Sequence, residues 1–181
     1  IDIFRITPRA DDTGTGLTVN GGMTLFDDQI MLSSLQDYNL GAPGTTGSVI
    51  LGVPTTTNLG PLISNPTMGV GGSVIHLANN NRVIGMRLNA ANAAATVFGN
   101  GFENTLPATN TYLTSNTITN YSIGANLQDL SGKVEITGNQ FTGLAGTSVD
   151  GLNLSAAAGS EMDLLLTNNT TSNNSGVGYQ V

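Results

Sequence analysis

The sequence of 181 residues has no cysteine and no tryptophan. Without cysteine the chain cannot form disulfides, thiolate nucleophiles, or cysteine-based zinc and iron–sulfur sites. Gly, Asn and Thr interrupt its apolar runs after a few residues, which is too short for a membrane-spanning helix. We therefore expect no membrane insertion of this segment.

Charge is also scarce. Charged residues make up 9% of the chain, against roughly one quarter in typical soluble domains. Twelve acidic residues outnumber five basic ones, for a net charge of −7, and the basic residues are spread along the sequence rather than clustered. Binding to phosphates requires a basic patch that releases counterions. The sequence thus excludes nucleic acid and anionic membrane as partners.

What the chain does have is Gly, Thr, Asn and Ser, together with an apolar fraction of 39% that is sufficient for one packed core. We expect a single domain over residues 1–181. The sequence starts at Ile1 without a signal-like segment and stops inside a strand-like stretch, residues 176–181. These features predict a fragment of a longer protein, or a subunit whose ends stack on like subunits.

The C-terminal half contains a repeat. Its copies cover residues 112–127, 134–154 and 164–179, and a looser copy covers residues 74–88. Three asparagines, Asn116, Asn139 and Asn169, recur at matching positions, spaced by 23 and 30 residues. Repeats of this length are typical of solenoids, in which the loops account for the varying interval.

Within each copy the apolar residues alternate, as in Val134 and Ile136, which predicts short strands with one buried face. Stacked coils would align these faces into a core, so the pattern predicts a parallel β-solenoid. Asn is suited to the corners, because its amide bonds backbone groups and it tolerates a left-handed conformation. We predict structural corners at Asn116, Asn139 and Asn169, with amides stacked in a ladder.

The N-terminal part is less regular. Short β-like segments separated by Gly, Pro and Asn predict the early coils, at residues 3–6, 17–19, 23–25 and 48–51. Three prolines and a run of threonines predict a loop excursion at residues 53–69. The Ala-rich stretch 90–95 is either a helical turn or a corner of small residues.

Apolar-x-apolar-Thr-x-Asn corners followed by Gly-x-Asn-Leu strands resemble the right-handed parallel β-helix repeats of the pectate-lyase-like superfamily. Residues 16–29 look like the opening of bacterial autotransporter or inverse-autotransporter passengers. The resemblance implies an all-β, right-handed, single-stranded parallel β-helix of about seven to eight coils, located outside the cell or on a bacterial surface. Enzymes, adhesins and filaments share such repeats, so the resemblance does not fix the function.

Candidate catalytic groups are few. The acidic pairs Asp11–Asp12 and Asp27–Asp28 are read as solvated turn acids, because neighbouring strand residues point to opposite faces. Resemblance to the polygalacturonase branch would imply Asn-Thr-Asp, Gly-His and Arg-x-Lys elements besides Asp-Asp, and only Asp-Asp is present. The sole histidine, His76, is read as a solvent-facing or corner-bonded residue rather than a general base.

Other polar motifs have structural readings. The carboxylates of Glu135, Glu161 and Asp163 are expected to point outward from the coil walls. The Gly-rich stretches 69–72 and 99–102 are expected to be corners, and the dipeptide at 150–151 a turn. We therefore predict no catalytic, cofactor or metal site.

We expect a non-enzymatic, adhesin-like β-helix that forms a rigid surface stalk or filament segment. Its expected partners are like subunits stacked end to end, or flanking repeats of the same protein, and surface glycans. Two alternatives remain open. One is a carbohydrate-active β-helix, a polysaccharide lyase or glycosidase, whose acids converge in three dimensions. The other is a glycan- or ice-binding module that uses flat Thr/Asn faces such as Thr117 and Thr119.

Overall fold

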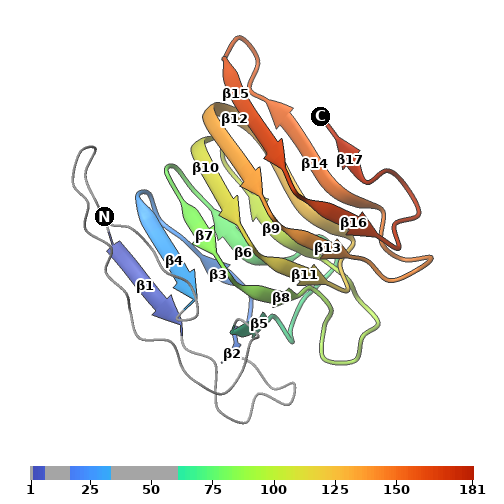
Figure 1. Ribbon diagram of the computed structural model, residues 1–181. Helices are drawn as coiled ribbons and strands as arrows, with labels where there is room; N and C mark the ends of the chain where they lie inside the picture. Colours follow the sequence, from blue (N-terminus) through green and yellow to red (C-terminus); the bar gives the residue numbers. More distant parts are fainter. Residues whose placement is uncertain (1, 7–16, 34–60) are drawn as a thin grey trace.

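The computed structural model describes residues 2–6, 17–33 and 61–181. These residues form short β-strands joined by turns, and no helix that could span a membrane occurs among them. Every pairing between the named strands is parallel, and the strands stack from the N-terminal to the C-terminal end of the chain (Figure 1). The predicted all-β parallel solenoid is confirmed.

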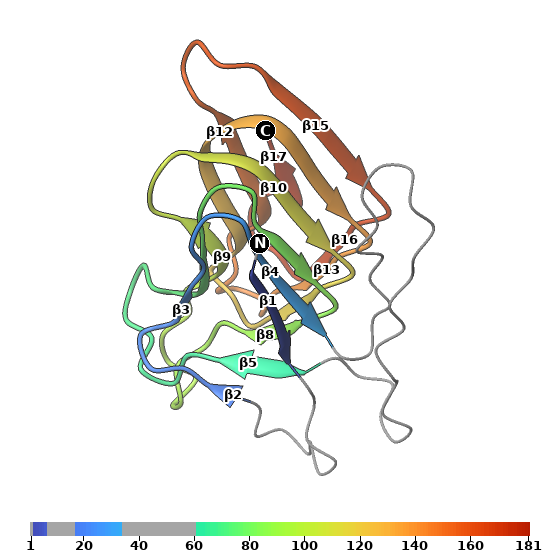
Figure 2. The same ribbon diagram turned by 90° about the vertical axis from the view of Figure 1, so that its left-hand side faces the viewer.

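Three walls enclose the core when the molecule is viewed from its β1 end (Figure 2). The first wall contains β1 (Asp2–Ile6), β4 (Gln29–Ser33), β7 (Arg82–Ile84), β10 (Ala108–Thr114), the C-terminal part of β12 (Ile123–Thr137) and β15 (Met162–Thr167). The second wall contains β2 (Leu17–Thr18), β5 (Leu62–Ser64), β8 (Arg87–Asn89), β11 (Thr117–Thr119), β13 (Gln140–Thr142) and β16 (Thr170–Ser172). The third wall contains β3 (Met23–Thr24), β6 (Ser73–Leu77), β9 (Asn100–Asn104), the N-terminal part of β12, β14 (Asp150–Ala156) and β17 (Tyr179–Gln180).

The chain visits the first, second and third walls in turn, and then returns to the first wall one strand further along. The described residues complete about five turns, fewer than the expected seven to eight coils. Residues 48–51 and 53–60 of the predicted early coil and loop lie outside the described part. Within the rest of the predicted excursion, residues 62–64 form β5.

Apolar side chains of neighbouring coils stack in register inside the walls. Each wall supplies a row of fully buried residues: Met31, Val83, Leu113 and Ile136 from the first, Ile63, Leu88, Ile118 and Phe141 from the second, and Ile75, Phe102, Ala125 and Leu152 from the third. Burying one large apolar side chain stabilises a fold by about 1.5–3 kcal/mol. The alternation read from the sequence thus becomes the core.

Glycines in the third wall allow it to approach the second. A Cβ atom on Gly124 would lie 2.4 Å from the Gly151 carbonyl oxygen and 2.4 Å from Cδ1 of Phe141. A Cβ on Gly101 would meet the Gly124 carbonyl oxygen at 2.5 Å. Gly101 and Gly151 lie inside β9 and β14, so the corner predicted at 99–102 and the turn predicted at 150–151 are wrong there. Close backbone approach, rather than turn geometry, explains these glycines.

The Ala-rich stretch 90–95 contains no helical turn. Ala91 forms an isolated antiparallel bridge with Phe98, and residues 93–95 make a turn between β8 and β9. Of the two readings left open by the sequence, the small-residue corner is the one observed. Among the connections from the second wall to the third, this one and the turn at 69–72 lengthen the coil without disturbing the stacking.

Candidate functional site

The three corner asparagines form a continuous ladder between the first and second walls. Oδ1 of Asn139 accepts hydrogen bonds from the backbone N–H of Asn116 at 2.9 Å and from its Nδ2 at 3.0 Å. Oδ1 of Asn169 accepts the same pair from Asn139, at 2.9 and 3.0 Å. We call Asn116, Asn139 and Asn169 the inner ladder, because the first two are only 1% exposed.

Each inner-ladder amide also bonds the coil before it. Nδ2 of Asn116 donates to the Val83 carbonyl, and Nδ2 of Asn139 donates to the Leu113 carbonyl, both at 2.9 Å. In the looser copy, Met86 stands at the ladder position, and its N–H donates to Oδ1 of Asn116. The ladder therefore ends at a side chain that cannot extend it.

The left-handed residue of each corner precedes the asparagine instead of being the asparagine. It is Ser115 (φ 54°), Gly138 (φ 66°) and Asn168 (φ 53°). The expectation that the stacked Asn itself adopts this conformation is therefore wrong. The two residues of each corner have different roles. The preceding residue turns the chain, and the Asn amide satisfies buried backbone groups.

A second set of polar groups stacks between the third and first walls. Nδ2 of Asn80 donates to Oδ1 of Asp28 at 2.9 Å, and Nδ2 of Asn110 donates to Oδ1 of Asn80 at 2.8 Å. All three residues are left-handed, with φ of 63°, 57° and 55°. We call Asp28, Asn80 and Asn110 the outer ladder, because its members are half-buried or exposed.

The outer ladder separates the carboxylates of the Asp27–Asp28 pair. Oδ1 of Asp27 accepts hydrogen bonds from the backbone N–H and Nδ2 of Asn79. Asp27 lines one hollow, whereas Asp28 lines a smaller one of about 220 Å³ beside Arg82 and Tyr112. Both are exposed turn acids, as expected, and they bond different neighbours. The other candidate pair, Asp11–Asp12, lies outside the described residues.

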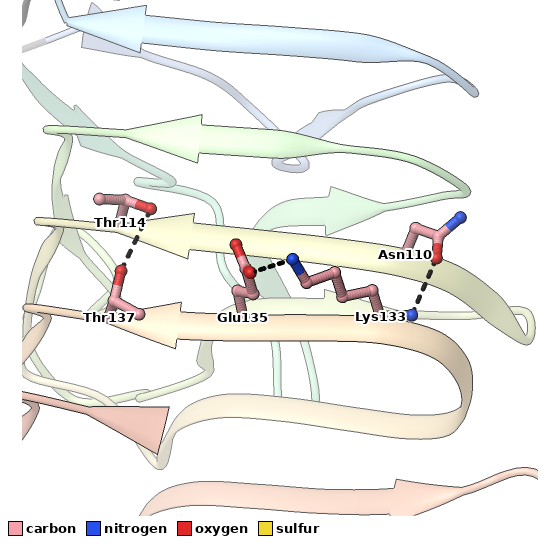
Figure 3. Close-up of polar contacts among 5 residues, drawn as sticks. All are labelled: Asn110, Thr114, Lys133, Glu135 and Thr137. Atoms are coloured by element: carbon pink, nitrogen blue, oxygen red, sulfur yellow. Dashed lines mark hydrogen bonds and ion pairs between the residues drawn. The ribbon is translucent and has the colours of Figure 1, made fainter. Parts of the chain in front are cut away.

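The remaining candidate acids lie on the outside of the first wall. Glu135 lies beside Lys133 (Figure 3), and Nζ of Lys133 is 2.5 Å from Oε1 of Glu135. The backbone N–H of Lys133 donates to Oδ1 of Asn110. The hydrogen bond that Lys133 donates to the Glu135 carboxylate raises the pKa of Lys133. Asp163 of β15 pairs with Lys133 in the strand register, and Glu161 directly precedes β15; both acids are exposed. Within the described ranges no three acidic or histidine residues are grouped to hold a metal ion.

His76 projects outward from β6, between Thr24 of β3 and Glu103 of β9 in the strand register. A ring nitrogen of His76 lies 3.0 Å from the hydroxyl of Ser73. That hydroxyl is almost completely buried, so it is not presented to a substrate as a nucleophile would be. The sequence predicted a solvent-facing or corner-bonded residue. In the structure His76 is half-buried and lines a hollow.

This hollow has a volume of about 610 Å³ and crosses three successive coils. Residues 24–27 and 105–107 form its two sides, and residues 76–79 form its floor. Two large apolar side chains stand on opposite sides, Phe26 at 69% exposed and Leu106 at 75% exposed. No sequence pattern indicates this hollow, because its two sides are far apart in the chain and only the register of the coils brings them together.

The outer face of the second wall carries Thr117 and Thr119. The Thr119 row contains small hydroxyl and amide side chains: Thr18, Ser64, Asn89, Thr119, Thr142 and Ser172. The Thr117 row also contains Leu62, Arg87 and Gln140. The Thr119 row is therefore uniformly small and polar, but neither row is a regular array of threonines.

No protein-family model matches the chain, and no similar curated protein or solved structure was found. The arrangement of the described residues is therefore the basis for the functional argument. It offers two built features, which are the axial hydrogen-bond ladders and the hollow beside His76.

Proposed function

We propose that the chain is a non-enzymatic, adhesin-like β-helix that acts as a rigid stalk or filament segment outside the cell or on a cell surface. The observation that carries the proposal is the inner ladder. It links the coils of Asn116, Asn139 and Asn169 to one another through hydrogen bonds between their amides, in addition to the parallel pairing of three walls. Bending the stack would break buried hydrogen bonds, and each orphaned group costs about 1–3 kcal/mol.

Rigidity can be measured with spin labels, because the natural chain has no cysteine. The pair Thr18→Cys and Ser172→Cys spans five coil spacings along one outward row, which is about 24 Å. We expect a narrow distance distribution at low and high salt. The control pair Ser64→Cys and Ser172→Cys should give a distance shorter by one spacing, about 4.8 Å. A broad distribution for both pairs would contradict a rigid stalk.

The distribution of acids supports the non-enzymatic part. Asp27 and Asp28 line different hollows, and Glu135 is paired with Lys133. Polysaccharide hydrolysis needs two carboxyl groups facing one bond, and lyase chemistry on calcium needs several carboxylates around one ion. We expect no new reducing ends or unsaturated products when the chain is incubated with neutral and acidic polysaccharides. Product formation that is lost in Asp27→Asn would establish the enzyme alternative.

Stacking on like subunits or on flanking repeats is the expected mode of assembly. Among the described residues no strand covers the outer edge of β15, and the inward side chains Leu164 and Leu166 are only partly buried. An open β-edge over apolar groups is a template for another strand. Sedimentation that shows only monomers at high protein concentration would rule out end-to-end stacking of this chain on itself.

A glycan-binding role is the second candidate, and the hollow beside His76 favours it. The ice-binding variant has less support, because Arg87 and Gln140 interrupt the Thr117 row.

A further inference from the structure

We infer that the hollow between Phe26 and Leu106 is a binding site for an uncharged sugar unit of a glycan chain. This inference adds a ligand site to the proposed stalk, and it does not depend on the stalk being rigid. The hollow has a volume of about 610 Å³, which falls within the roughly 300–1,000 Å³ of small-molecule sites. Its two apolar side chains, Phe26 and Leu106, are open to solvent.

The exposed apolar side chains stand on backbone that is fixed by buried amides. The N–H of Phe26 donates to Oε1 of Gln29 at 2.9 Å, and its carbonyl accepts from Nδ2 of Asn81 at 2.7 Å. On the other side, Nδ2 of Asn104 donates to the Leu106 carbonyl at 2.8 Å. All three amide side chains are buried. Both sides of the hollow are therefore held in place before any ligand arrives, which lowers the entropic cost of binding.

Polar groups lie between the apolar sides. Asn79 occupies only Oδ1 of Asp27 with its two hydrogen bonds, and a carboxylate offers about four acceptor positions. The imidazole of His76 also lines the hollow, and both of its ring nitrogens lie near the Ser73 hydroxyl, at 3.1 and 3.0 Å. The Thr24 hydroxyl lines the same space. Acceptors and donors around an exposed aromatic ring match a sugar, which presents hydroxyl groups at its edge and C–H groups on its face.

Charge narrows the ligand class. None of the described residues that line the hollow is Lys or Arg, and Asp27 lines it directly. Glu103 lies next to His76 in the strand register and adds a second negative group nearby. An acidic polysaccharide such as a galacturonate chain would be repelled by these carboxylates. The hollow therefore suits a neutral sugar rather than the anionic substrates that pectate-type β-helices would require.

The single histidine of the chain provides the readout. We would titrate the protein with neutral trisaccharides of glucose, galactose, mannose or xylose, and follow the ring signals of His76 by NMR. At least one of them should shift these signals in a saturable manner. Phe26→Ala should weaken this binding at least about fivefold, because a ligand loses its aromatic contact. Asp27→Asn keeps an oxygen that can accept the hydrogen bonds from Asn79, so it should weaken binding less than Phe26→Ala does.

Matched controls test whether the effect is local. Val70→Ala removes another exposed apolar side chain, 95% exposed and outside the hollow, and Asp163→Asn removes a distant exposed carboxylate. Neither should change the affinity. The inference is overturned if no neutral trisaccharide shifts the His76 signals, if Phe26→Ala binds as the natural chain does, or if a galacturonic acid trimer binds more tightly than every neutral sugar. Each of these outcomes leaves the spin-label distances of the stalk proposal unaffected.

Discussion

The inner and outer ladders place the same amide chemistry at two corners of one solenoid, but at different depths. In the inner ladder Asn116 and Asn139 are almost completely buried, and every amide also satisfies a backbone carbonyl. In the outer ladder Asp28 is exposed and Asn80 is half-buried, so water can replace a lost partner. The two corners therefore make similar hydrogen bonds. They differ in the cost of losing one, because the group left behind is unsatisfied in the inner ladder and bonds to water in the outer ladder.

This difference separates two roles. The inner ladder holds the coils together, because its partners are backbone groups that have no access to water. The outer ladder shapes the surface next to the hollow, since Asp28 follows Asp27 in the chain and Asn80 follows Asn79. We expect stability to depend on the inner corner and ligand contacts to depend on the outer one.

The largest expected effect comes from Asn139→Ala. This change removes the acceptor of two Asn116 donors and the donor to the Leu113 carbonyl, all of them buried. Since each orphaned buried group costs about 1–3 kcal/mol, we expect unfolding in urea to show a loss of about 3 kcal/mol. A loss below about 1 kcal/mol would remove the distinction between the two corners.

A third corner, at Tyr121, can sharpen the comparison through pH. Tyr121 is fully buried, and its hydroxyl donates to Oδ1 of Asn174 at 2.9 Å. Burial raises the pKa of Tyr121 from 10.0 to about 12, against the smaller opposing effect of that hydrogen bond. Between these values the unfolded phenol loses its proton while the folded one keeps it. Because the native state then binds more protons, stability falls as the pH rises from 10 to 12.

The measurement compares the natural chain with Tyr121→Phe in urea at several pH values. We expect the natural chain to lose about 2 kcal/mol relative to the variant between pH 10 and 12. Below pH 10 the variant should be less stable by about 1 kcal/mol, because it lacks the hydrogen bond to Asn174. Parallel stability curves over the whole range would show that this corner is open to water like the outer ladder.

The sequence was sufficient to predict the inner corner. Asn116, Asn139 and Asn169 recur because every coil repeats one corner geometry, and a repeated requirement leaves a repeated residue. The glycine near the start of the third-wall strands was also visible, although close packing against Phe141 explains Gly124 better than a corner does. Local patterns identify positions of this kind because the same physical constraint acts in each coil.

The outer corner and the hollow could not be predicted in the same way. The outer ladder mixes an aspartate with two asparagines, and its members Asp28, Asn80 and Asn110 are 52 and 30 residues apart, so only the register of three coils shows that they stack. Phe26 and Leu106 look like ordinary apolar residues in sequence, and their exposure follows from the loops on which they stand. Features that occur once, between coils, leave no periodic signal.

Asn110→Ala tests the outer ladder directly and should have a small effect. The change removes a hydrogen bond to Asn80 and an acceptor for the Lys133 N–H, but water can reach both groups. Alanine is also less suited than Asn to the left-handed conformation at this position. From these two effects we expect the free energy of unfolding in urea to fall by about 1 kcal/mol, well below the loss expected for Asn139→Ala. Equal losses in the two variants would mean that burial does not set the difference.

The smallest effect is expected for the ion pair on the same outer surface. Lys133→Met removes the contact to Glu135 but keeps the aliphatic stem and the backbone hydrogen bond to Asn110. The Lys133 side chain is 52% exposed, so solvent and salt screen the pair, and such surface pairs contribute little to stability. We expect the urea midpoint to stay the same within error at low and high salt. A salt-dependent loss comparable to that of Asn110→Ala would show that charge, and not only neutral amide stacking, holds this face of the solenoid together.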